Sequence, residues 1–158
     1  MPTPDEAIAA GPDAEAAQLR LERLRETGVA LPSDDPGATL LAAVLSSGDF
    51  LSDILLANPE RWPALLADPW LVRCKPRELF AQELRTACAA VRSFAELQRA
   101  LRRYARGEML RLGAREIGVG LGPSAFTLPE HGLTLDVARE LSALADVCLQ
   151  ETVTFCEE

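Results

Sequence analysis

The segment from Ser93 to Gly118 combines an apolar helix face with ionisable side chains that could do chemistry or bind a partner. Its apolar residues recur every three or four positions, which predicts an amphipathic α-helix. The apolar face would carry Phe94, Leu97, Leu101, Tyr104 and Leu112. Every other element of the chain is expected to pack around this helix.

Glu108 falls in the middle of that apolar face. Arg111 and Arg115 follow it one and two turns later, only slightly displaced from the same stripe. Because an isolated buried charge is strongly unfavourable, Glu108, Arg111 and Arg115 are predicted to form a buried ion network. Glu140 or Asp136, further along the chain, could complete it.

The opposite face of the helix is basic and forms a candidate docking face. It carries four arginines at helical spacing, Arg99, Arg102, Arg103 and Arg106. This arginine face can be a solvated or intradomain surface, or it can dock on a neighbouring domain or a protein partner. Nucleic acid is not expected as a partner, because lysine is nearly absent, Tyr104 is the one interleaved aromatic and the chain is acidic.

The net charge is −8 but unevenly distributed. Residues 73 to 115 carry a net charge of +7, which leaves −15 on the rest of the chain. Oppositely charged segments can pack across one another inside one domain. Alternatively, a basic docking face lies on an otherwise acidic body.

Motifs for catalysis or cofactor binding are not recognised, so no catalytic, cofactor-binding or metal-binding residue is predicted. The four cysteines contain no CxxC pair, and the lone His131 cannot complete a metal set. The run Gly118 to Gly122 superficially suggests a phosphate cradle. No predicted strand leads into it and no Gly-Lys-Ser/Thr follows, which favours a glycine-rich turn in the loop from Gly118 to Gly132.

Composition favours an all-α fold, because leucine and alanine dominate and β-branched residues are scarce. The chain of 158 residues is expected to form an irregular bundle of about six to seven helices. Short helices are predicted in the N-terminal half and two or three long ones in the C-terminal half. Capping and breaking residues place them at about 13–26, 38–46, 50–57, 63–67, 76–91, 93–118 and from 134 to the end.

The apolar pattern of the chain becomes more regular after the prolines at positions 32 and 36, which predicts a division of the chain into two parts. Residues 1–36 are expected to be a mobile N-terminal arm with one weak helix, and residues 37–158 a helical domain. The last helix ends on Glu157 and Glu158, the unfavourable charge for a helix C-terminus, so we expect the domain to be truncated there. No signal peptide or membrane segment is recognised, which favours a cytoplasmic protein.

Three stretches of the chain resemble bacterial glutamine synthetase adenylyltransferases. The central run from Leu101 to Glu116, LRRYARGEMLRLGARE, is similar to a family helix in which an arginine pair precedes an R-x-x-E-M-x-R-I-x-x-R-D pattern. SGDFLSDILLANPE, residues 47–60, is similar to the family's "S-D-F-L…H-P-E" segment, and TLDVARELSALAD, residues 134–146, to its "T-x-E-V-x-R-E-L-S-x-L-A-D" helix. The three occur in the family's order.

The resemblance implies a position and a role. Such enzymes carry two nucleotidyltransferase domains, which attach AMP to a tyrosine of glutamine synthetase and remove it, and the parent enzyme is expected to use ATP and Mg²⁺. The Asp-x-Asp metal motif of those domains is absent from this chain. The chain therefore resembles the N-terminal helical region before the first of them and is expected to be inactive alone.

The partners implied by the resemblance are the neighbouring nucleotidyltransferase domain, and further glutamine synthetase and a PII-type signal protein. The alternative is a stand-alone helical adaptor that binds a protein through the arginine face.

Overall fold

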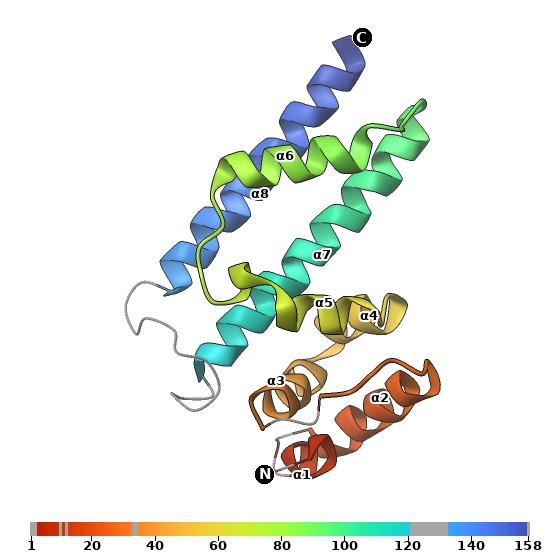
Figure 1. Cartoon of the computed structure of the whole chain (residues 1–158), viewed down its shortest axis with the longest axis vertical. Coiled ribbons are helices and arrows are strands. Elements are labelled where there is room, and N and C mark those ends of the chain that lie inside the picture. Colours follow the sequence, from red (N-terminus) through yellow and green to blue (C-terminus); the bar gives the residue numbers. More distant parts are fainter. Residues whose placement is uncertain (1–2, 10, 12, 33–34, 121–132, 158) are drawn as a thin grey trace. The chain divides into compact units, whose positions relative to one another are not determined.

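The computed structural model describes residues 3–9, 11, 13–32, 35–120 and 133–157 (Figure 1). These residues form eight α-helices and one short 3-10 helix, η1, and contain no strand. The predicted all-α class is confirmed. The elements are α1 (Pro4–Ala9), α2 (Ala14–Glu26), α3 (Asp35–Ser46), α4 (Asp49–Ala57), α5 (Arg61–Ala67), η1 (Pro69–Leu71), α6 (Arg77–Cys88), α7 (Phe94–Gly120) and α8 (Leu133–Glu157).

The lengths of the helices follow the prediction. The helices before Lys75 have at most 13 residues, whereas α7 has 27 and α8 has 25. The predicted loop from Gly118 to Gly132 begins later than expected, because α7 continues to Gly120. The rest of that loop lies outside the described residues.

Two compact units replace the single helical domain that was predicted. The first comprises Met1–Arg73 and Leu110–His131, and the second comprises Cys74–Met109 and Gly132–Glu158. The boundary was not recognisable from composition, because it falls inside α7, which has no glycine or proline break at Met109 and Leu110.

In the first unit, α1 and α2 both pack on α3, and α3 turns into α4 (Figure 1). Residues 1–36 were expected to form a mobile arm with one weak helix, and the structure shows more helix there. This region forms two helices whose apolar side chains, Ile8, Ala17, Leu21 and Leu24, are at most 1% exposed. Because α1 has only six residues, its apolar pattern was too short to be recognised in the sequence. Burial against α3 stabilises this helix.

The corner between α3 and α4 depends on Gly48, whose φ of +113° favours glycine. The buried hydroxyl of Ser52 donates to the Gly48 carbonyl at 2.8 Å. Arg20 of α2 joins the same corner, because its guanidinium donates to the Leu45 carbonyl and to the Asp49 carboxylate, both at 2.6 Å. Hydrogen bonds to otherwise unsatisfied helix-end carbonyls stabilise this turn.

In the second unit, α6 packs on α8, and the first half of α7 completes the core (Figure 1). The buried residues are Phe80, Leu84, Cys88, Leu97, Ala100, Leu144 and Val147. Phe94, expected on the buried face of α7, is 50% exposed because it is the first residue of the helix.

Among the described helices, none is by itself long and apolar enough to cross a membrane. Only α3 and α4 together, joined at a bend of 116°, pass that test of length and composition.

Candidate functional site

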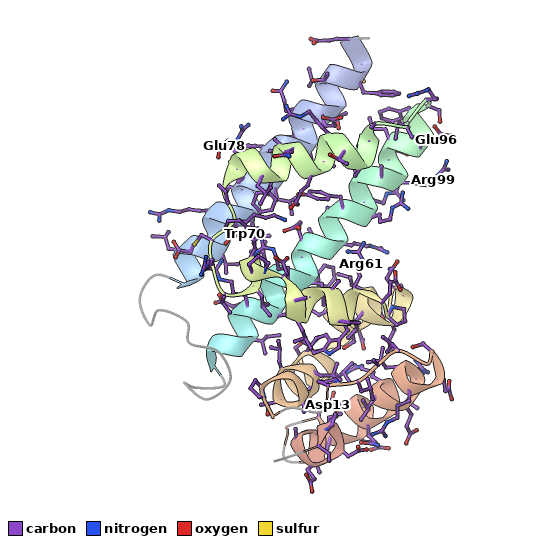
Figure 2. All side chains as sticks on the ribbon, viewed as in Figure 1. Asp13, Arg61, Trp70, Glu78, Glu96 and Arg99 are labelled. Atoms are coloured by element: carbon purple, nitrogen blue, oxygen red, sulfur yellow. The ribbon has the colours of Figure 1, made fainter. Side chains whose placement is uncertain are left out.

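The arginine face lies on the first half of α7, in the second unit. Arg99, Arg102, Arg103 and Arg106 are all solvent-exposed, as expected for a docking face. Arg99 and Arg103 border a depression of about 200 Å³ between the end of α6 and the start of α7. The depression is also lined by four apolar residues, Ala87, Ala90, Val91 and Ala100, and by Glu96. Figure 2 shows Glu96 and Arg99 on the first turns of α7.

The start of α7 is fixed by a capping box of Ser93 and Glu96, which orients these arginines. The Glu96 backbone N–H donates to the Ser93 hydroxyl at 3.3 Å. The Glu96 carboxylate in turn accepts from the Arg92 backbone N–H at 2.7 Å, one residue earlier than the usual capping-box donor. This hydrogen bond from the Arg92 N–H is the main cause that lowers the pKa of Glu96, and the Arg99 charge adds to it.

Glu108 is buried, at 8% exposure, and one of its ion-pair partners, Lys75, was not among the predicted members of the network. Lys75, in the turn before α6, places its Nζ 2.8 Å from Glu108 Oε1 and 2.5 Å from Glu83 Oε2. Only 2% of the Lys75 side chain is exposed. The ammonium also lies 5.1 Å from the centre of the Phe80 ring, a favourable cation–π distance.

Tyr104 completes this Lys75 cluster, which we define as Lys75, Glu83, Glu108, Tyr104 and Phe80. The Tyr104 hydroxyl lies 2.9 Å from the Glu83 carboxylate and 3.3 Å from the Phe80 carbonyl, so it donates to acceptors on α6. Burial raises the pKa of Tyr104, and the charges of Glu108 and Glu83 raise it further. The phenol is therefore a hydrogen-bond donor throughout the physiological range.

One feature of the sequence points to Lys75, although helical periodicity does not reveal it. Lys75 is the only lysine among the sixteen basic residues. A single ammonium in a chain of arginines indicates a position where a compact point charge with three donors fits and a planar guanidinium does not. Its two carboxylate partners and the Phe80 ring occupy three sides of that ammonium.

Arg111 and Arg115 are buried at 2% exposure each, as predicted, and belong to the first unit. Arg111 donates to the Trp70 carbonyl at 2.8 Å, and Arg115 donates to the Arg73 carbonyl at 3.3 Å. Both arginines therefore hold the irregular chain around η1. The sequence could not reveal these acceptors, because they are backbone atoms of a segment about forty residues away.

The other two predicted members of the network lie on α8. Glu140 is buried at 4% exposure, which agrees with a place inside the second unit. Asp136 pairs with Arg139 of its own helix at 3.4 Å.

The Lys75 cluster is a set of paired charges in which Lys75 and Glu108 are buried and Glu83 is partly exposed. Its ammonium is in contact with both carboxylates, and its phenol remains protonated, so the cluster ties the turn before α6 to α6 and α7. Among the residues that the structure describes, no group of three or more His, Cys, Asp or Glu side chains could hold a metal ion. No cofactor is assigned to either unit.

Comparisons with known proteins give no match for this chain among family models, curated proteins or solved structures.

Proposed function

We propose that the chain is a non-catalytic helical segment of a glutamine synthetase adenylyltransferase. The observation that carries this proposal is the order of the three resembling stretches. Each coincides with a helix: residues 47–60 include α4, residues 101–116 lie in α7, and residues 134–146 lie in α8. An all-α architecture is what such a segment requires, since its parent's chemistry resides in separate domains.

Within that parent, the arginine face is the docking surface. Exposed guanidinium groups bind carboxylates with bidentate geometry, and the adjoining apolar depression accepts a small side chain. The surface fits an acidic patch of the neighbouring nucleotidyltransferase domain, with glutamine synthetase and a PII-type protein as further partners. ATP and Mg²⁺ bind to that neighbouring domain, and the protein works in the cytoplasm.

A second function is favoured by the same surface. Because four exposed arginines and an apolar depression occur together on one face, the chain can also act as a stand-alone adaptor for an acidic protein surface. In the first function a catalytic domain is part of the same polypeptide, whereas in the second the chain carries no catalytic domain.

Reading the gene beyond codon 158 separates them. The first proposal expects a frame that continues into a Gly-Gly/Ser turn followed by Asp-x-Asp. A frame that stops directly after Glu158 overturns it and leaves the adaptor.

The docking surface is tested in the full polypeptide, assayed for AMP attachment to and removal from glutamine synthetase. Arg102→Glu/Arg106→Glu is expected to reduce at least one of the two activities about tenfold or more, since opposite-charge contacts become like-charge contacts. Arg77→Glu/Arg85→Glu makes the same charge change at two exposed positions of α6. If both double variants keep full activity, the arginine face is only a solvated surface.

A further inference from the structure

One face of α8, in the second unit, carries no charged residue and is largely solvent-exposed. Leu135 is 57% exposed and Leu149 is 66% exposed, whereas Leu144 and Val147 on the other side are 3% exposed. Scattered exposed leucines are common on protein surfaces, so the residues between these two on the same face decide whether they form an interaction surface. The feature is independent of the arginine face, which lies on α7.

The residues of this face repeat with heptad spacing. They follow one another at alternating steps of three and four positions, which is the spacing of a coiled-coil seam. The α8 seam consists of Leu135, Ala138, Ser142, Ala145, Leu149, Thr152 and Cys156. None of them is charged.

The two hydroxyls in the α8 seam do not need an outside partner. Ser142 donates to the Ala138 carbonyl at 2.9 Å, and Thr152 donates to the Cys148 carbonyl at 2.8 Å. Both bonds are internal to the helix. The α8 seam therefore offers methyl and methylene groups together with polar groups that are already satisfied, and it can be desolvated at little cost.

The α8 seam is complementary to itself when a second copy runs antiparallel. In the register that sets Ser142 against Ala145 of the other copy, Ala138 lies opposite Leu149 and Leu135 lies opposite Thr152. Each large side chain then faces a smaller one, which allows two helices to approach closely.

Charge at the edge of the α8 seam selects this register. Arg139 and Asp146 flank the seam on the same side, seven residues apart. Arg139 lies 3.4 Å from Asp136 of its own helix, and 70% of its side chain is exposed. In the antiparallel register above, Arg139 of each copy also lies next to Asp146 of the other, which adds two ion pairs between the copies by symmetry. A shift by one heptad in one direction brings Asp146 against Asp146, and in the other direction Arg139 against Arg139. A parallel pair does not bring Arg139 and Asp146 together.

We infer that the chain forms a homodimer in which the α8 seams of two copies pack antiparallel, with Arg139 of each copy paired to Asp146 of the other. This contact uses a surface separate from the proposed arginine face, and it holds whether or not that surface docks on a catalytic domain.

Sedimentation equilibrium of the full 158-residue chain, in the presence of a reductant because Cys74 and Cys156 are exposed, tests the dimer. The unaltered chain is expected to show a concentration-dependent monomer–dimer equilibrium. Ala145→Arg is expected to abolish it, because two guanidinium groups would be buried close to the symmetry axis. Circular dichroism checks that the variant keeps its helix content.

Charge reversal tests the register. Asp146→Arg is expected to weaken dimerisation about tenfold, because both ion pairs become repulsive. Arg139→Glu/Asp146→Arg restores the pairs with exchanged signs and is expected to return the affinity to within about threefold. Glu157→Arg makes the same charge change as Asp146→Arg at an exposed α8 position outside the seam, and it should leave the affinity unchanged.

A chain that remains monomeric at every accessible concentration overturns the homodimer and assigns the α8 seam to a different partner. A dimer that survives Ala145→Arg, or a double charge reversal that fails to rescue Asp146→Arg, overturns the antiparallel α8 contact.

Discussion

Lys75 and Glu108 form an ion pair of 2.8 Å between residues that are 33 positions apart in the sequence. Both residues are buried, with 5% of Lys75 and 8% of Glu108 exposed. The pair joins the turn before α6 to the middle of α7 inside the second unit. Glu83 and Tyr104 extend it, so removal of one member leaves other polar groups buried with fewer partners.

Lys75→Met should destabilise the protein by about 3 kcal/mol, because methionine keeps the length of the side chain but leaves the Glu83 and Glu108 carboxylates without their ammonium. Urea unfolding followed by circular dichroism measures the free energy. Arg77→Met, at an exposed position two residues later, is the matched control and should change stability by less than about 0.5 kcal/mol. Equal effects of the two substitutions would contradict a buried Lys75 cluster.

Glu108→Ala should also cost on the order of 3 kcal/mol, since the buried Lys75 ammonium loses one of its two carboxylate partners. The double variant Lys75→Met/Glu108→Ala should lose less than the sum of the two single variants, because it removes both charges together. A thermal unfolding curve of Glu108→Ala that superimposes on that of the unaltered chain would refute the burial of Glu108.

Tyr104 should remain protonated above pH 10, its ordinary pKa, for as long as the protein is folded. Its pKa is raised in the folded state, so the stability linked to it is present below pH 10 and is lost as the pH rises further. Tyr104 is the only tyrosine, so the phenolate absorbance reports on it alone. The absorbance should appear together with alkaline unfolding, and a phenolate signal in the folded protein near pH 10 would contradict this.

Tyr104→Phe should cost about 1 kcal/mol at neutral pH, because the hydrogen bond to Glu83 is lost. It should also remove the part of the alkaline destabilisation that comes from tyrosine ionisation. Unfolding measured at neutral and alkaline pH gives both values, and Arg85→Ala at an exposed position of α6 serves as a control.

Whether Gly113→Ala stabilises or destabilises the protein should depend on the side chain at position 51. A methyl group at position 113 would lie 2.6 Å from Leu51 Cδ1 and 2.9 Å from its Cδ2 in the first unit, so Leu51 has to move. We expect a loss of about 1 kcal/mol in the unaltered chain. In a Leu51→Ala background the same substitution should stabilise by about 1 kcal/mol, because alanine is the better helix former. Identical effects in both backgrounds would exclude the clash.

Asp5 should contribute a small, acid-sensitive stabilisation through its ion pair with Arg25, which joins α1 to α2. The hydrogen bond from Arg25 lowers the pKa of Asp5, so this contribution is present above pH 3.8 and is lost as the pH falls through the lower folded-state value. Because 43% of the Asp5 side chain is exposed, Asp5→Asn should cost only about 0.5 kcal/mol at neutral pH. The difference should vanish in acid, whereas Asp53→Asn, at an exposed position of α4, should show none at either pH.

The amino-acid pattern was enough to predict the helical class, most helix boundaries and the side of α7 on which each charge lies. These features are local: they depend on the spacing of apolar residues, on Gly28 and Gly48 at turns, and on the Ser93 and Glu96 cap. For the same reason the exposure of the four arginines and the burial of Glu108, Arg111 and Arg115 could be predicted.

The partners of these buried charges were established by the folded structure. That Glu108 pairs with Lys75, and that Arg111 and Arg115 donate to the carbonyls of Trp70 and Arg73, depends on how distant segments pack, and helical periodicity carries no information about it. The same holds for α1, a helix of six residues that is too short to be stable alone and forms because Ile8 is buried in the core of its unit. Local spacing fixes which face of a helix is apolar, whereas long-range packing fixes what that face touches.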